Sequence, residues 1–363
     1  SAAFSRGIIQ SNEEPKETFG FPTQTPAPFV EELKEFSPEV TRLIDETRWR
    51  KNFNNPVQHN LKTTIKDIQN KGDQMFVKSD KGASFYLMKP QDYGSLLKNS
   101  LTSLYKKSSL EDVNETLKAD KKIAEEIELE DRIMVSTPRE AFGLLKDGKE
   151  DFREKPNIRL INPTKPELGR VSKQLVEKLV AEIKGKTQLC QWKNTLSCLQ
   201  WFDKVQDKEN HTFMKLDINN YYGSISKTLL DETISWASSI VDIDEQTKKI
   251  LYHVRRCFLF HQSEPWVKKD NPEFDVPQGA FDSAEVSDLC GLYVLYKLRE
   301  ELRGIPVTAG LYRDDMLLLS GLNRPAQREA AERASRLLPR ARVRNQAGGE
   351  QEDCGLSRCH AEF

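Results

Sequence analysis

Three aspartates stand at the ends of apolar segments, where carboxylates are well placed to bind a metal ion. Asp217 follows the largely apolar run Thr212–Leu216, and Asp314 and Asp315 are adjacent in a turn between two apolar stretches. Neighbouring carboxylates repel each other, and a bound cation is the simplest compensation for that cost. Mg²⁺, or Mn²⁺ in its place, prefers such hard oxygen ligands. Taken singly, each aspartate is equally typical of an ordinary solvated turn.

Two more segments accompany these aspartates in the sequence. Tyr221 and Tyr222 follow shortly after Asp217, and Val276–Ser283 places Pro-Gln-Gly before an amphipathic helix. An aromatic pair after a strand is also consistent with simple core packing. Gln-Gly before a helix is equally consistent with an ordinary loop and helix cap. The order of the three segments therefore carries more information than any one of them.

In this order the segments resemble the motifs of reverse transcriptases. That family has a strand ending in Asp-x-x-x-aromatic-aromatic, then Pro-Gln-Gly-x-x-x-Ser, then Tyr-x-Asp-Asp, which stands here as Tyr312–Asp315. Three upstream basic segments resemble the fingers of retroelement polymerases, of the Penelope-like or a related group: Lys78–Gly82, Leu145–Lys149 and Ile158–Pro163. The likeness covers about residues 60–320, and the chain is truncated, relative to the family, after Tyr-x-Asp-Asp.

The resemblance implies an α+β fold, with the fingers and palm of a right-hand polymerase and an antiparallel palm sheet backed by helices. It also implies two-metal nucleotidyl transfer from a dNTP to a primer 3′-hydroxyl on an RNA or DNA template. Asp217, Asp314 and Asp315 would be the catalytic residues. The same three carboxylates and the carbonyl of Ile218 would be the metal ligands.

The resemblance assigns substrate-binding roles to five further residues. Tyr222 corresponds to the steric gate that rejects a ribonucleotide 2′-hydroxyl, which favours a DNA product. Gln278 and Gly279 would lie against the template base and the incoming nucleotide, because a glycine lets the backbone come close. Arg159 and Lys81 would hold the triphosphate, since guanidinium and ammonium groups suit phosphate oxygens.

The chain departs from the family after Asp315. No primer-grip strand pair is recognisable, too few residues follow for a thumb, and Lys297 is the last lysine. We therefore keep as an alternative that the chain is a truncated, catalytically inactive retroelement relic that at most binds nucleic acid. A polymerase that makes RNA is a third interpretation, which Tyr222 disfavours.

The composition is that of a globular protein that would bind nucleic acid through local charge. A net charge of -1 over 363 residues excludes a uniformly basic coat but leaves room for a basic cleft. No apolar run reaches the roughly 18 residues of a membrane span. The six scattered cysteines predict reduced thiols in an intracellular protein. A nuclear or cytoplasmic location follows only by analogy with retroelement polymerases.

Hydrophobic periodicity indicates the elements that must position these residues. We expect a flexible segment over 1–27, N-terminal helices and fingers over 28–205, a palm over 206–340 and an atypical tail over 341–363. Ser226 and Asp244 are expected to cap helices. The expected helices lie at 28–49 (with a break at Pro38), 61–72, most of 90–147, 171–183, 283–300 and 325–338, and the strands within 75–88, 159–161, 212–216 and 311–319.

Overall fold

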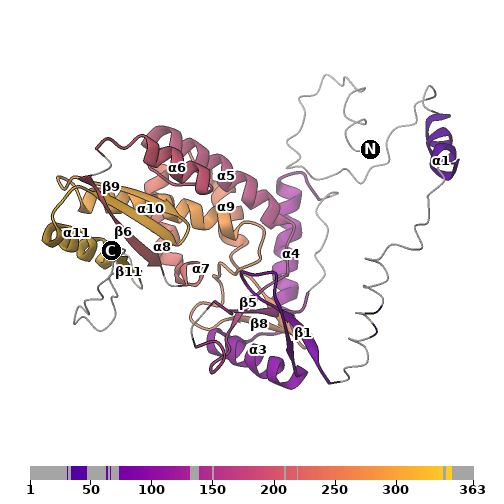
Figure 1. Cartoon of the computed structure of the whole chain (residues 1–363). Helices are drawn as coiled ribbons and strands as arrows, with labels where there is room; N and C mark the ends of the chain where they lie inside the picture. Colours follow the sequence, from indigo (N-terminus) through magenta and orange to yellow (C-terminus); the bar gives the residue numbers. More distant parts are fainter. Residues whose placement is uncertain are drawn as a thin grey trace. The chain divides into compact units, whose positions relative to one another are not determined.

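The structure is a computed structural model that describes residues 34–46, 73–130, 139–148, 151–207, 210–218, 220–337 and 341–345, together with residues 31, 63 and 66. The chain divides into two compact units (Figure 1). The first takes its residues from 1–103, 124–134 and 142–160, and the second from 104–123, 135–141 and 161–363. Each unit has a hydrophobic core of its own.

The first unit contains two small sheets. β1 (Met75–Lys78) and β2 (Phe85–Met88) form an antiparallel hairpin, and β4 (Phe142–Leu145) pairs with β5 (Ile158–Ile161). α3 (Pro90–Leu104) contributes to the same core. The buried residues of this core are Val77, Leu97, Leu145 and Ile158.

The first described helix, α1, spans Phe36–Glu46. Pro38 lies in its first turn, where the missing N–H removes no helical hydrogen bond. α1 therefore begins two residues before Pro38, close to the expected break, and residues 34 and 35 form a turn instead of a helix.

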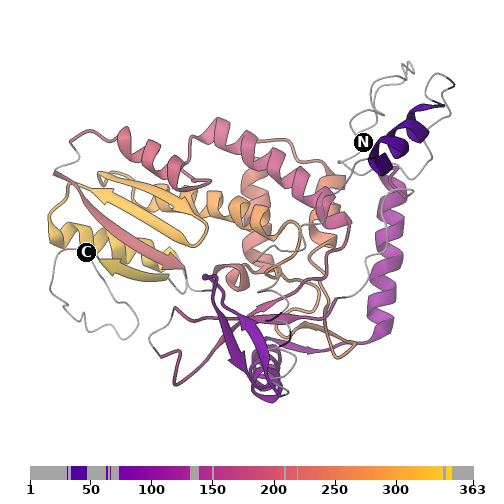
Figure 2. The same ribbon diagram turned by 45° about the vertical axis from the view of Figure 1, so that its right-hand side comes forward.

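The second unit is organised around a four-stranded antiparallel sheet in the order β11-β6-β10-β9 (Figure 2). Its strands are β6 (Thr212–Ile218), β9 (Val307–Tyr312), β10 (Asp315–Ser320) and β11 (Ala341–Asn345). Side chains alternate along a strand, so Met214, Leu216 and Ile218 are buried and the residues between them face the opposite side. One face of the sheet joins the core, and the other is available for polar residues.

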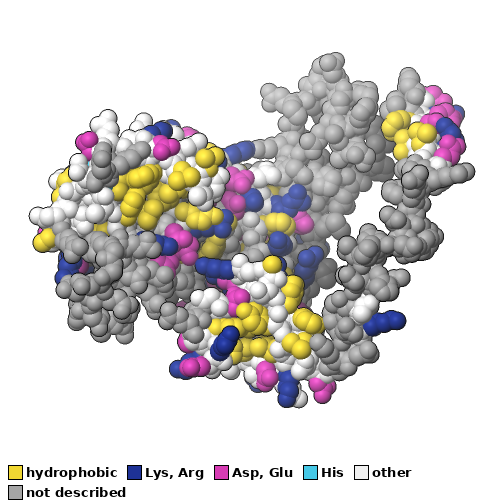
Figure 3. Space-filling view, viewed as in Figure 1, with side chains coloured by type: hydrophobic (Ala, Val, Ile, Leu, Met, Phe, Trp, Pro, Cys, Tyr) yellow, Lys and Arg dark blue, Asp and Glu magenta, His cyan; other side chains and the backbone are white. Residues whose placement is uncertain are grey.

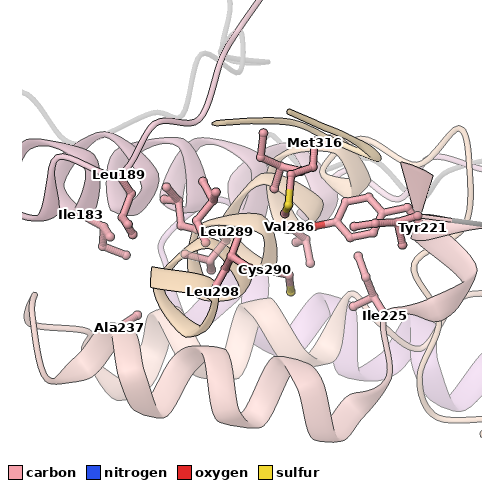
Figure 4. Packing of buried hydrophobic residues seen from close by; sticks show 14 of the residues in the cluster. Ile183, Leu189, Tyr221, Ile225, Ala237, Val286, Leu289, Cys290, Leu298 and Met316 are labelled. Atoms are coloured by element: carbon pink, nitrogen blue, oxygen red, sulfur yellow. The ribbon is translucent and has the colours of Figure 1, made fainter. Parts of the chain in front are cut away.

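Several helices contribute to the core of the second unit, among them α5 (Leu168–Thr187), α8 (Lys227–Ser238), α9 (Glu245–His253), α10 (Ser283–Glu301) and α11 (Arg324–Leu337). α10 supplies many of the buried side chains, and Figure 4 shows several of them close to Met316 of β10. Because α10 is buried along much of its length, its first turns are held firmly beside the sheet.

The remaining described elements are a three-stranded sheet and further helices. β3 (Tyr105–Lys107), β8 (Glu264–Lys268) and β7 (Leu259–His261) form an antiparallel sheet in this order. The other helices are α4 (Leu110–Glu126), α6 (Thr195–Asp203) and α7 (Tyr221–Ser224). Within the described ranges, none of the helices combines the length and the apolar character that a membrane crossing needs.

Several expected elements are confirmed by the structure. Ser226 and Asp244 cap α8 and α9, because each side chain accepts a hydrogen bond from a backbone N–H of the first turn. The strand pairs expected within 75–88 and 311–319 are β1–β2 and β9–β10.

The segment 90–147 is mostly helical as expected, with α3 and α4, and it also contains the short strands β3 and β4. One expectation differs from the structure. Residues 341–345, which we expected to begin an irregular tail, form the edge strand β11 and pair with β6. The expectations for 1–27 and 346–363, and most of that for 61–72, lie outside the described residues.

Candidate active site

The backbone positions of the three aspartates lie at one end of the sheet in the second unit. The register of β6 and β10 places Asp217 directly opposite Asp315. Residues opposite each other in an antiparallel pair point to the same face, with Cβ atoms about 5 Å apart. The N–H of Ile218 donates to the carbonyl oxygen of Asp314 at 3.0 Å, so the β9–β10 turn lies beside the end of β6.

Lys215 joins the aspartates on this face. It lies two positions before Asp217 along β6, and side chains two positions apart in a strand point to the same face. Its Nζ lies 2.8 Å from Oδ1 of Asp315, and both side chains are about half exposed. Sequence reasoning missed Lys215, although the Lys-x-Asp spacing is a usable signal.

The carboxylates fit a magnesium site by their chemistry and backbone placement. In the part of the chain that the structure describes, no three or more His, Cys, Asp or Glu side chains converge tightly enough to form a metal-binding group. Mg²⁺ does not require such a group, since it is commonly held by one or two carboxylates, water and substrate phosphates. Asp315 contacts Lys215, and Asp217 and Asp314 are the other two carboxylates at this end of the sheet.

The far end of the same sheet face is aromatic. A Cβ at Gly310 would lie only 2.0 Å from the ring of Trp192, so the glycine admits this ring against the strand. Trp192 packs on Trp201 with centroids 5.0 Å apart, and Phe202 on Phe213 at 5.3 Å. Figure 3 shows hydrophobic side chains gathered over α6 and the adjoining sheet. The face is therefore acidic at one end and apolar at the other.

The two tyrosines after Asp217 have different environments. Tyr221 is buried, and its hydroxyl donates to the carbonyl oxygen of Ser287 at 2.7 Å, so it packs α7 against α10. Tyr222 is half-buried, with its ring 6.2 Å from that of Tyr221. Burial raises the pKa of Tyr222, and the positive charge of Arg313 opposes that rise. Tyr222 is thus the one of the two tyrosines whose side chain is partly exposed.

Arg313 occupies the turn between β9 and β10 in a left-handed conformation, with φ +53°. Its guanidinium carbon lies 5.6 Å from the ring centre of Tyr312, and the side chain is half-buried. Burial lowers the pKa of Arg313, but Tyr222 and Tyr312, and to a smaller extent the charges of Asp288 and Glu285, raise it overall. Arg313 is therefore part of a charged group with the first turns of α10.

We predict that Asp288→Asn stabilises the protein at neutral pH. Burial raises the pKa of Asp288 from 3.8 to about 6, with Arg313 opposing the rise and Glu285 adding to it. The native state therefore binds this proton more tightly than the unfolded chain does. The stability that the carboxyl contributes is present below about pH 4 and is lost as the pH rises through about 6.

Urea unfolding measures this effect. At about pH 7.5 we expect the free energy of unfolding of Asp288→Asn to exceed that of the unsubstituted protein by about 1–2 kcal/mol, after discounting for partial exposure. At about pH 4.5 the difference should be smaller, because the native carboxyl is then protonated. A difference of the same size at both pH values would contradict the prediction.

Gln278 and Gly279 form a turn shortly before α10. Gly279 has φ +111°, and a Cβ there would lie 2.5 Å from the carbonyl oxygen of Asn162. The carbonyl oxygen of Gln278 accepts a hydrogen bond from the N–H of Asn162 at 3.0 Å. The glycine is therefore required by the close approach of the protein's own backbone, a reason that the sequence does not reveal.

Arg159 and Lys81 belong to the first unit. Nε of Arg159 lies 3.2 Å from Oδ2 of Asp80, whose side chain is 8% exposed, so this carboxylate anchors the guanidinium. Lys81 is exposed in the β1–β2 connection. The aspartates, Ile218, Tyr222, Gln278 and Gly279 all lie in the second unit.

No protein-family model matches the sequence, and no curated protein matches it. Among solved structures, apo telomerase from Candida tropicalis is similar, with a TM-score of 0.52 and 9% identity over 77% of this chain and 54% of that one. A form of this telomerase truncated from its C-terminal domain gives 0.51 and 10% identity, over 78% of this chain and 61% of that one.

At such low identity the likeness shows the fold alone. The chain has a mixed helix-and-sheet fold with small antiparallel sheets, similar to the fold of telomerase. It covers little more than half the length of these telomerase chains. The α+β class predicted above is therefore confirmed at this level.

Proposed function

We propose that the chain is the core of an RNA-directed DNA polymerase, derived from a retroelement of the Penelope-like or a related group. The observation that carries this proposal is the β6–β10 register, which places Asp217 opposite Asp315 and beside Asp314. The telomerase-like fold supports it. In this proposal the sheet of the second unit is the palm, and β1–β2 with Arg159 belongs to the fingers.

Asp217 and Asp314 would hold Mg²⁺ through carboxylate oxygens, with the carbonyl of Ile218 as a further ligand. When bound, two such ions would lower the pKa of the primer 3′-hydroxyl and neutralise the leaving pyrophosphate. The protein would position these oxygens at the ends of paired strands, because phosphoryl transfer depends mainly on positioning and on charge neutralisation. Lys215, through its ion pair with Asp315, would hold that carboxylate beside them.

The remaining side chains would select and hold the substrates. Tyr222, half-buried five residues after Asp217, would exclude the 2′-hydroxyl of a ribonucleotide by its bulk. Gln278 and Gly279 would support the incoming dNTP and the template base. Arg159, anchored by Asp80, would bind the triphosphate together with Lys81.

Primer extension on an RNA template with dNTP and Mg²⁺ tests the proposal. We expect incorporation by the unsubstituted chain, none after chelation of the metal, and none by Asp314→Ala. An RNA–DNA hybrid should bind in a salt-sensitive way in every case, because binding rests on phosphate contacts. Hybrid binding without incorporation, unchanged by Asp314→Asn, would reject the polymerase and favour the inactive relic.

A further inference from the structure

The turn that contains Gln278 and Gly279 rests on Asn162, which is 4% exposed. Besides the bond from its N–H to the carbonyl of Gln278, its Nδ2 donates to the carbonyl of Phe258 at 3.0 Å. Its Oδ1 accepts from the N–H of Thr164 at 3.0 Å. Both ends of the Asn162 side-chain amide are hydrogen-bonded, so the residue is held in place. Its backbone N–H can therefore fix the position of the turn.

A buried ion pair holds the same turn from the α10 side. Asp282 lies three residues after Gly279, and its Oδ2 accepts hydrogen bonds from Nη2 of Arg255 and from Oγ of Ser172. The side chains of Arg255 and Asp282 are 0% and 2% exposed. The turn is thus bonded to Asn162 at Gln278 and is followed, three residues after Gly279, by a buried side chain that this pair fixes.

The segment before the turn is held by further contacts, one of them to the backbone of Arg255. The N–H of Asp275 donates to the carbonyl of Arg255 at 2.8 Å. The carboxylate of Asp275 accepts from the hydroxyl of Tyr105 at 2.8 Å and lies 3.3 Å from Nζ of Lys268. Ser283 at the start of α10 donates to the carbonyl of Pro277 at 2.7 Å.

Stability alone is a poor explanation of the Arg255–Asp282 pair. Two buried nitrogens of Arg255, Nε and Nη1, have no hydrogen-bond partner among the described residues. Buried ion pairs are often no more stabilising than apolar residues of similar size, and unpaired donors add a cost. Such a pair does fix the orientation of the two side chains, because a charge-assisted hydrogen bond between two held groups tolerates little displacement.

We propose that Asn162 and the Arg255–Asp282 pair are positioning residues, which set the place at which Gln278 and Gly279 meet the incoming nucleotide. This inference rests on the proposed polymerase function. The residues touch no substrate themselves and act through the backbone of residues 275–283. Their loss should therefore weaken the use of dNTP more than the binding of the primer–template.

The double variant Arg255→Met/Asp282→Leu removes both charges and keeps the buried volume, so it is expected to fold. A displacement of a substrate-positioning group by about 1 Å can reduce enzymatic efficiency up to about 100-fold. We therefore expect the KM for dNTP to rise about 10- to 100-fold, with a smaller change in kcat. The Kd for primer–template should change by less than about twofold. Asn162→Ala, which leaves no buried charge, should shift KM in the same direction.

The matched control is Arg256→Met/Glu273→Leu, which removes the neighbouring ion pair at the surface, where Nε and Oε2 are 3.2 Å apart. It should leave KM unchanged. The inference would be overturned if the double variant and Asn162→Ala both fold and keep the KM of the unsubstituted chain. It would also be overturned if these variants lower the melting temperature without changing KM.

Hydrogen exchange of residues 275–283 separates this inference from the proposed function. If the unsubstituted chain incorporates no dNTP, the polymerase proposal fails, but faster exchange confined to this segment in Asn162→Ala still supports the positioning role. Unchanged exchange there would overturn the positioning role as well.

Discussion

Asp217→Asn should reduce the rate of dNTP incorporation about 10³-fold. The metal ions that this carboxylate would help to hold are worth several kcal/mol of transition-state stabilisation, and each 1.36 kcal/mol corresponds to a factor of ten. Asparagine keeps the size of the side chain and removes its charge. Because Asp217 faces Asp315 across the sheet, losing one negative charge relieves repulsion and should change the free energy of unfolding by at most about 0.5 kcal/mol.

Single-turnover incorporation, measured with saturating primer–template, isolates this effect from substrate binding. Asp242→Asn, at an exposed position between α8 and α9, is the matched control and should retain full activity. A residual rate within about tenfold of the unsubstituted chain would show that Asp217 does not hold the reacting metal.

The parts of this fold that depend on local pattern are predictable from the sequence. The β9–β10 pair follows from apolar residues on both sides of a polar turn, and the caps of α8 and α9 from Ser226 and Asp244. The strand β11 also has a local signal, because Ala-Arg-Val-Arg-Asn alternates apolar and polar residues. The surrounding segment is rich in arginine and has little periodicity, so this short alternation does not stand out in the sequence.

The long-range contacts of the candidate site are less accessible to sequence reasoning. That β6 pairs with β10 in the register that joins Asp217 to Asp315 is expected from the motifs only through the family resemblance. The bond from Ser172 to Asp282 joins residues 110 positions apart, and no periodicity indicates it. Partners such as Arg255 are chosen by tertiary packing, and a buried arginine looks like any surface arginine in the sequence.

Arg313 shows the same limit at shorter range. Its place between Tyr312 and Asp314 is evident from the sequence, but the direction of its side chain depends on the backbone of the turn. With φ +53°, the residue lies in the left-handed region that few side chains adopt. The turn is half-buried beside α10, so the guanidinium lies near Asp288 instead of in open solvent.

Tyr222→Ala should allow the proposed polymerase to use ribonucleotides. Replacing the half-buried ring by a methyl group removes the bulk that would meet a 2′-hydroxyl. Exclusion by shape in such a pocket is worth about 1–3 kcal/mol, so the ratio of kcat/KM for NTP to that for dNTP should rise about 10- to 100-fold. Competition between matched NTP and dNTP in primer extension measures this ratio directly.

Tyr222→Phe distinguishes ring bulk from the hydroxyl group. The hydroxyl interacts with Ser287 and with the charge of Arg313, whereas the ring alone supplies the bulk. If the ring excludes the ribose, Tyr222→Phe keeps the discrimination of the unsubstituted chain, and Tyr222→Ala loses it. Equal loss in both variants would contradict steric exclusion, because the phenyl ring of Tyr222→Phe fills nearly the same space.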